Sequence, residues 1–86
     1  MSESHEHRLK RLKMRSMRRG IKEMDIILVR FSDAHLDAMD DAALTLYDSL
    51  LSENDQDLYQ WVTGQAEAPE IFRALITDIA REVNAL

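Results

Sequence analysis

The sequence MRRGIKEMD at residues 17–25 decides the fold, because it places three basic residues, one glycine and two acids between two helix-prone segments. A helix often ends at a glycine, whose backbone adopts the left-handed conformation without steric cost. We therefore expect a first helix to end near Arg19 and a second to start at Gly20. Arg18, Arg19 and Glu23 would then complement the dipoles of the two helices.

Three arginines before Gly20 follow one another at i,i+4 spacing and share one face of the first helix: Arg11, Arg15 and Arg19. Like charges at this spacing repel each other by about 0.2–0.5 kcal/mol per pair. Arg8 and Arg18 widen this basic stripe. We expect the first helix to lie at the edge of the domain with its cations in water, as a solvated face or as a site for an anionic partner.

Length and composition predict a single helical domain over residues 1–86. The chain is 45% hydrophobic and has only two glycines and one proline, so it is globular and has few of the breaks that a β-fold needs. The absence of cysteine excludes disulfides, thiolate nucleophiles and the usual structural zinc sites.

The location expected from the sequence is the bacterial cytoplasm. No apolar run approaches the length of about 20 residues that spans a membrane, and the N-terminus lacks the apolar region of a secretory signal. These features predict a soluble protein without membrane insertion. The arginine-rich start is similar to a mitochondrial presequence, but presequences avoid acids, and Glu3 and Glu6 interrupt it. The mitochondrial matrix is therefore the less favoured location.

The net charge of −5 hides an asymmetry between two parts of the chain. Residues 1–22 hold 8 basic and 2 acidic residues, whereas residues 23–86 hold 3 basic and 14 acidic residues. A surface with two faces of opposite sign suits oriented docking on a protein, whereas nonspecific nucleic-acid binders are usually basic overall.

The first two helices are expected from apolar spacing at about 3.6 residues per turn. Ser4 is placed to cap the first helix, behind frayed residues 1–4, and the second helix continues toward Asp37. Residues 26–31 would also suit a strand, but a lone strand has nothing to pair with. The expected core residues of these two helices are Leu9, Leu12, Met17, Met24, Ile27, Leu28 and Phe31.

Three more helices complete the predicted fold, which is all-α and a compact bundle of about five short helices. Asp40 caps the third, Asn54 or Asp55 caps the fourth, Gly64 ends the fourth, and Pro69 fits the first turn of the fifth. Their expected apolar faces are Ala43, Leu44, Tyr47, Leu50 and Leu51 in the third, Leu58, Trp61 and Val62 in the fourth, and Ile71, Phe72, Leu75, Ile76, Ile79 and Val83 in the fifth.

The chain offers no constellation for catalysis or metal binding. A nucleophile with its base and a phosphate-cradling glycine loop are both missing, so no catalytic residue is assigned. His5 and His7 are two positions apart, which turns them about 200° from each other on a helix, and His35 stands alone, so no metal site is expected. Asp55 and Asp57 fall at a helix start, where capping explains them.

Two spaced motifs resemble those of the succinate dehydrogenase flavinylation (assembly) factors of bacteria and mitochondria. The first is RGxxExD at residues 19–25, followed by Leu28 and Phe31. The second is the acidic and aromatic pattern YDxLLxExDxDxYxW at residues 47–61. The resemblance covers about residues 15–63, and the tail after Gly64 is not diagnostic.

The resemblance implies an assembly chaperone with five helices, not an enzyme. It would bind the flavoprotein subunit of succinate dehydrogenase, and in some bacteria of fumarate reductase, and promote covalent attachment of FAD to it. In the chemistry of that family the flavin 8α-methyl is deprotonated and a histidine of the partner attacks the flavin. FAD would then belong to the partner and not be held tightly by this chain, whose direct contact with FAD is left open. A monomer is expected.

The partner-binding residues implied by the motif are Arg15, Arg18, Arg19, Gly20, Glu23 and Asp25. Gly20 would permit close approach of the backbone, Arg19 can hold a carboxylate in a planar two-point contact, and Glu23 can bind an arginine.

The alternative function is a small helical nucleic-acid-binding protein that uses the basic stripe from Arg8 to Arg19. The sequence offers this alternative charge but no aromatic stacking residue before Phe31. The assembly-factor interpretation involves no nucleic acid.

Overall fold

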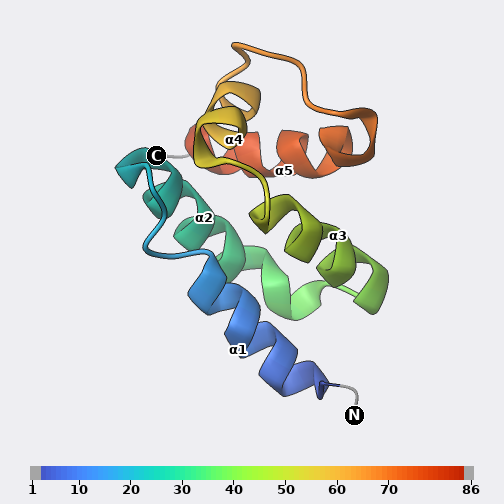
Figure 1. Ribbon diagram of the computed structural model, residues 1–86. Helices are drawn as coiled ribbons and strands as arrows, with labels where there is room; N and C mark the ends of the chain where they lie inside the picture. The colour runs from blue at the N-terminus through green and yellow to red at the C-terminus, as the bar shows by residue number, and fades with distance from the viewer. Residues whose placement is uncertain (1–2, 85–86) are drawn as a thin grey trace.

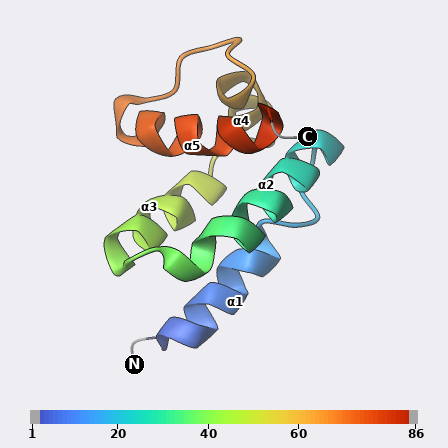
Figure 2. The same ribbon diagram turned by 180° about the vertical axis from the view of Figure 1, so that it is seen from behind.

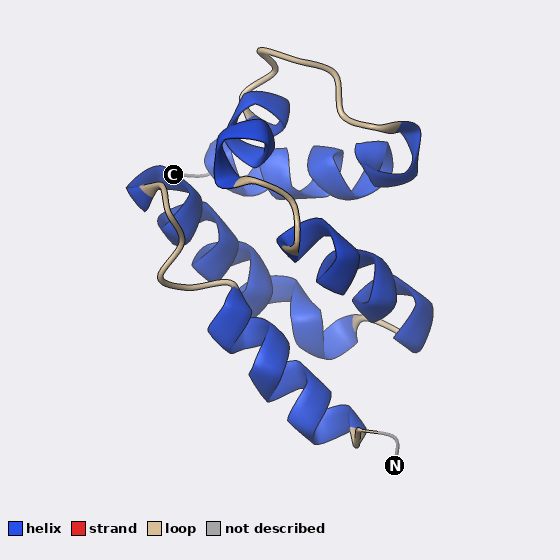
Figure 3. Ribbon diagram, viewed as in Figure 1, coloured by secondary structure: helices blue, strands red, loops and turns tan. Residues whose placement is uncertain are grey.

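Five α-helices and two short 3-10 helices make up the secondary structure of residues 3–84, the part of the chain that the computed structural model describes (Figure 1). They are α1 (His5–Arg15), α2 (Lys22–His35), η1 (Leu36–Ala38), α3 (Asp41–Leu51), α4 (Asp55–Val62), η2 (Glu70–Phe72) and α5 (Arg73–Asn84). No strand occurs within residues 3–84 (Figure 3), so the predicted all-α fold is confirmed and residues 26–31 belong to α2.

The second helix is the element around which the others pack. It contacts α1, α4, α5 and η1. The successive helices α1, α2 and α3 run in alternating directions, and α4 and α5 lie together at one end of the molecule (Figures 1 and 2). Met24, Ile27, Leu28 and Phe31 are all buried and follow the i, i+3, i+4, i+7 spacing of one helix face. This spacing places the β-prone residues 26–31 in a helix.

Side-chain caps set three helix starts as predicted. Ser4, Asp40 and Asn54 each accept a hydrogen bond from a backbone N–H in the first turn of α1, α3 and α4. Gly64, with a φ of 80°, follows the end of α4. Pro69 precedes the 3-10 helix η2, so the fifth helical segment begins with a tighter turn than the predicted α-helical one.

The buried apolar side chains form one cluster, to which all five α-helices contribute. The Phe31 and Tyr47 rings lie at its centre, 5.6 Å apart between centroids. Trp61 is half-buried, packs against this cluster and stacks on Phe72 with 6.3 Å between ring centroids. Trp61 therefore packs against the core as predicted, although its indole is not fully enclosed. That the whole chain, residues 1–86, is one domain stays a prediction.

Two residues expected in the core lie on the surface. Met17 is 43% exposed, because α1 ends at Arg15 and its helical register does not extend to position 17. Ile71 is 67% exposed, because it lies in η2, where three residues per turn replace 3.6 and shift the buried face.

The predicted fraying of residues 1–4 falls partly on residues 1–2, which lie outside the described residues. For residues 3–4 it stays a prediction. The Glu3 carboxylate accepts hydrogen bonds from Arg11, and the Ser4 hydroxyl caps α1. Within residues 3–84, no helix is both long and apolar enough to cross a bilayer.

Candidate docking site at the loop between α1 and α2

The loop at residues 16–21 begins earlier than the sequence predicted, because α1 ends at Arg15 rather than near Arg19. The Ser16 side chain is fully buried, and its hydroxyl donates to the Leu12 carbonyl at 2.8 Å. Since that hydroxyl proton is used, the Tyr47 hydroxyl is the donor in the 2.6 Å contact with Ser16 Oγ. A serine that bonds back to its own helix and to a buried tyrosine competes with helix continuation.

The left-handed residue of the loop is Arg18, with a φ of 58°, and not Gly20 as predicted. A left-handed conformation costs a residue with a Cβ about 1–2 kcal/mol. The Arg18 backbone N–H donates to Asp25 Oδ1 at 3.1 Å, and Asp25 lies half-buried in the first turn of α2. Asp25 therefore braces the turn at Arg18 from within the chain.

The Arg19 side chain points inward and binds three segments. Its Nε donates to Asp55 Oδ1 at 2.7 Å, its Nη1 to the Arg15 carbonyl at 2.9 Å, and its Nη2 to the Leu51 carbonyl at 3.1 Å. The Arg19 and Asp55 side chains are only 12% and 18% exposed. The guanidinium thus joins the end of α1, the end of α3 and the start of α4. It binds only one oxygen of Asp55, so the planar two-point contact with a carboxylate that the sequence suggested for Arg19 does not form within its own chain.

Gly20 closes the same contact from the backbone. Its N–H donates to Asp55 Oδ2 at 2.6 Å, so both carboxylate oxygens of Asp55 hold the loop. A Cβ at position 20 would lie 3.0 Å from Oδ2, which is too close for that oxygen to stay in place. The glycine is required here for close approach of Asp55 and not for a positive φ. We call Arg19, Gly20 and Asp55 the Asp55 clasp.

The basic stripe is bound by acids of the same chain. Arg11 donates to Asp48 Oδ2 at 3.0 Å and to Glu3 Oε2 at 2.8 Å, and Arg15 binds Asp48 and Ser52. The hydrogen bond from Arg11 holds the pKa of the Asp48 carboxyl below its ordinary value, although partial burial acts in the opposite direction. The expectation of a stripe with its cations in water is wrong, because α3 supplies a carboxylate that two of the arginines share.

Two motif side chains remain turned toward solvent. Arg18 and Glu23 are exposed, and within residues 3–84 neither side chain takes part in a hydrogen bond or an ion pair. Lys22 is exposed beside them, and two apolar side chains flank them, Met17 at 43% and Ile26 at 46% exposed. We call these five residues, Met17, Arg18, Lys22, Glu23 and Ile26, the loop surface. Of the six predicted partner-binding residues, the structure turns the side chains of Arg15, Arg19 and Asp25 to internal contacts.

Sequence reasoning missed Asp48 and Asp55 as the partners of the arginines. It assigned Asp55 to capping, whereas Asn54 caps α4 and leaves the Asp55 carboxylate free for the loop. The signal that could have found them is the acidic pattern at residues 47–61. It follows the basic stripe at a distance that allows a pair of helices to fold back and bring the two patterns together.

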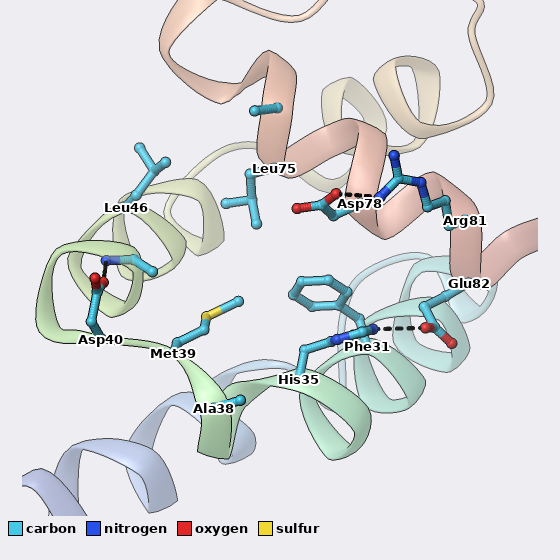
Figure 4. Close-up of a pocket in the computed structure, with 12 residues that line it drawn as sticks. Phe31, His35, Ala38, Met39, Asp40, Leu46, Leu75, Asp78, Arg81 and Glu82 are labelled. Carbon is cyan, nitrogen blue, oxygen red and sulfur yellow. Dashed lines mark hydrogen bonds and ion pairs between the residues drawn. The ribbon is translucent and has the colours of Figure 1, made fainter.

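A groove lies between η1, α3 and α5, apart from the loop (Figure 4). This groove has a volume of about 680 Å³ and an apolar floor that includes Phe31, Met39 and Leu75. The charged side chains at its rim bind one another, with His35 Nε2 2.9 Å from Glu82 Oε1 and Arg81 Nη1 2.9 Å from Asp78 Oδ1. Asp40 adds a further carboxylate to the rim.

The histidines lie apart in the structure. His5 Nδ1 is 3.7 Å from Asp41 Oδ1, whereas His35 Nε2 forms a hydrogen bond with Glu82 Oε1. In the part of the chain from residue 3 to 84, no group of three or more His, Cys, Asp or Glu side chains is arranged to hold a metal ion.

Comparison with known families places these features in context. A profile of the family described as "Flavinator of succinate dehydrogenase" matches residues 10–83, which include both motifs, the Asp55 clasp and the loop surface. The chain belongs to this flavinator family. The resemblance drawn from the sequence is thereby confirmed.

Several curated proteins are similar to this member of the flavinator family. One from Meyerozyma guilliermondii is 46% identical over 61 residues, covering 71% of this chain and 45% of the relative. One from Schizosaccharomyces pombe is 39% identical over 72 residues, covering 84% of this chain and 52% of the relative. One from Danio rerio is 36% identical over 75 residues, covering 85% of this chain and 48% of the relative. The chain spans about half the length of these relatives.

All three relatives are named "Succinate dehydrogenase assembly factor 2, mitochondrial". The family is therefore one of assembly factors, as the resemblance implied. The names point to the mitochondrion, so the expectation of a bacterial cytoplasmic location is wrong. The acids Glu3 and Glu6, on which that expectation depended, are too weak a signal to outweigh the mitochondrial names of these relatives.

Proposed function

We propose that this chain promotes covalent attachment of FAD to the flavoprotein subunit of succinate dehydrogenase, and that it docks on that subunit through the loop surface. Membership of the flavinator family over residues 10–83 supports the reaction that is served. The observation that carries the docking site is the exposure of Arg18 and Glu23, whose side chains have no internal partner within residues 3–84.

The chemistry of the loop surface suits a protein partner. In the chain, an exposed cation and an exposed anion, Arg18 and Glu23, fall between two exposed apolar residues, Met17 and Ile26. Charged groups of both signs fix the orientation of two proteins, and apolar groups supply burial on contact. Arg18 can bind a carboxylate of the partner in a planar contact, and Glu23 can accept from an arginine or lysine.

We propose that the chain acts as an assembly factor and not as the catalyst, and that FAD is held by the partner. The groove between η1, α3 and α5 supports this division, because its rim has the carboxylates Asp40, Asp78 and Glu82 and its one arginine is already bound to Asp78. The pyrophosphate of FAD needs backbone N–H groups or unpaired cations. We also propose that the chain serves the flavoprotein subunit of fumarate reductase in the same way, and that it acts as a monomer.

The nucleic-acid alternative has less support than the sequence suggested. Phosphate groups would have to displace Asp48 and Asp55 from the arginines that these acids bind. Exchange of one anion for another gains little, because each arginine would lose a carboxylate contact for the phosphate contact that it gains, and the freed carboxylates would repel the phosphates.

The test of the proposed function measures covalent flavin on the isolated flavoprotein subunit, incubated with FAD and with the wild-type chain or a variant. The wild-type chain should accelerate the appearance of flavin fluorescence on the denatured subunit. Glu23→Ala should slow it by more than tenfold at unchanged thermal stability, since loss of one half of a desolvated charged contact costs about 2–5 kcal/mol. Glu70→Ala is the matched control, because Glu70 is also exposed but lies in η2, outside the loop surface.

Two results would contradict this proposal. If the wild-type chain does not accelerate flavin attachment, the function is wrong. If it does, and Arg18→Ala, Glu23→Ala and the double variant all act at the wild-type rate while folded, the loop surface is not the docking site.

A further inference from the structure

We propose that Asp55 is a positioning residue for docking: through Arg19 and Gly20 it holds the loop in the one shape that presents Arg18 to the partner together with Glu23 of α2. This inference rests on the proposed function. Asp55 itself does not touch the partner in this proposal, and it acts only through the conformation of residues 16–21.

The Asp55 clasp uses both oxygens of the Asp55 carboxylate. One carboxylate oxygen takes the Arg19 Nε–H and the other takes the Gly20 N–H, at 2.7 Å and 2.6 Å. The remaining guanidinium N–H groups of Arg19 reach the carbonyls of Arg15 and Leu51. Each group is therefore oriented by the next, and a planar guanidinium that donates in several directions restricts the loop more than a single contact would.

The loop has few other constraints on its conformation. Its first residue, Ser16, is buried, and its last, Ile21, is half-buried against the core, but of the residues between them only Arg19 turns its side chain inward. Between those two points, three backbone N–H groups are bound: that of Met17 by the Met14 carbonyl, that of Arg18 by Asp25 and that of Gly20 by Asp55. Release of Asp55 should therefore change the loop while the main cluster of apolar side chains stays packed.

The position of Asp55 in the chain separates this role from that of a helix-starting acid. Asp55 and Asp57 both lie in the first turn of α4, where either charge favours the helix dipole. Only Asp55 reaches the loop, whereas Asp57 is exposed. A comparison of variants at these two positions therefore cancels the effect on the helix and leaves the effect on the loop.

The experiment compares Asp55→Ala, Asp55→Asn and the matched control Asp57→Asn. Three quantities are measured for each: the affinity for the flavoprotein subunit, the hydrogen–deuterium exchange of the loop amides, and the thermal melt. Affinity is measured below the melting transition of every variant. Asp55→Asn retains the shape of the side chain and one acceptor oxygen, so it provides a folded variant if Asp55→Ala is too unstable.

The proposal predicts that Asp55→Ala binds at least tenfold more weakly and that its Gly20 amide exchanges at least tenfold faster. Asp55→Asn should lie between Asp55→Ala and the wild type on both measures, because it loses the charge but not the shape. Asp57→Asn should match the wild type. Gly20→Ala, whose Cβ would push Asp55 Oδ2 away, should weaken binding with the carboxylate still present.

Other results overturn the inference. If the Gly20 amide exchanges faster in Asp55→Ala but the affinity stays at the wild-type value, the shape of the loop does not control docking. If Glu23→Ala weakens binding and both Asp55 variants do not, Asp55 has no positioning role, although the proposed function stands. If the wild-type chain does not bind the flavoprotein subunit, the proposed function fails first and this inference with it.

Discussion

Arg18 and Arg19 are neighbours with the same side chain, and the structure uses them in opposite ways. Arg19 is turned inward, where Asp55 and two backbone carbonyls bind it. Arg18 is turned outward, and within residues 3–84 only its backbone N–H takes part in an internal hydrogen bond, with Asp25. The difference shows that a motif can contain both the residues that shape a loop and the residues that the loop presents.

The same contrast holds for the whole basic part of the chain. The excess of cations in residues 1–22 suggested a basic face open to a partner. In the structure, Arg11, Arg15 and Arg19 are bound to acids from α3 and α4. The charge available to a partner is therefore carried by Arg18 and Lys22, together with Lys10 on the outer face of α1.

The largest expected effect is on stability when the inward arginine is removed. Arg19→Ala should lower the free energy of unfolding by about 3 kcal/mol, because it leaves the Asp55 carboxylate and two carbonyls without their donors in a site with little exposure. Arg18→Ala should change it by less than about 0.5 kcal/mol. Chemical denaturation of both variants checks this, and equal losses would remove the distinction between the two arginines.

The contact between Tyr47 and Ser16 at the start of the loop provides a prediction for stability at high pH. Burial raises the pKa of Tyr47 to about 12 from an ordinary value of 10.0. The unfolded chain therefore loses this proton first, so the stability contribution of the neutral hydroxyl is complete below pH 10 and is lost as the pH rises toward 12. The expected loss is about 2.7 kcal/mol, from about 1.36 kcal/mol per pKa unit.

Tyr47→Phe is the control for this pH dependence, because it keeps the ring in the core and removes the titrating hydroxyl. The decline in stability above pH 10 should be smaller in this variant by the amount assigned to Tyr47. Denaturation curves across this pH range provide the measurement, and identical declines in the two proteins would contradict the assignment.

The basic stripe provides a smaller effect at low pH. Because Arg11 holds the pKa of Asp48 below its ordinary value of 3.8, the unfolded chain takes up this proton first as the pH falls. The contribution of Asp48 to stability is thus complete above the ordinary value and is lost as the pH falls through the lower folded value. Asp48→Asn should lower the free energy of unfolding by about 1–2 kcal/mol at neutral pH and reduce the loss of stability as the pH falls. Asp33→Asn, at an exposed acid of α2, should leave both unchanged.

The smallest expected effect concerns the backbone of Arg18. Arg18→Gly relieves the cost of a positive φ but increases the freedom of the unfolded chain, so stability should rise by no more than about 1 kcal/mol. Arg18→Ala keeps the strained backbone and should show no such gain. If the side chain of Arg18 contacts the partner, both variants lose affinity for the flavoprotein subunit. A variant with full affinity would show that the partner does not need this side chain and contacts only the backbone at position 18.

How much the sequence predicted depended on how local each feature is. The caps at Ser4 and Asp40 and the buried face of α2 follow from residues within one or two turns, and the prediction of each is confirmed. The early end of α1 was not predictable, because the Ser16 hydroxyl binds Tyr47 from a distant helix. For the same reason, the sequence alone could not separate the motif residues that are turned inward from those that are turned outward.

The loop surface as the docking site is tested most directly by methyl NMR of the chain labelled at methionine and isoleucine, titrated with the flavoprotein subunit. The molecule carries its own controls, because Met17 and Ile26 belong to the loop surface, whereas the exposed Ile71 lies in η2 and Met39 lines the groove. The account predicts that the Met17 and Ile26 signals shift or broaden on binding and that those of Ile71 and Met39 do not. Changes at Ile71 or Met39 with Met17 and Ile26 unaffected would contradict it.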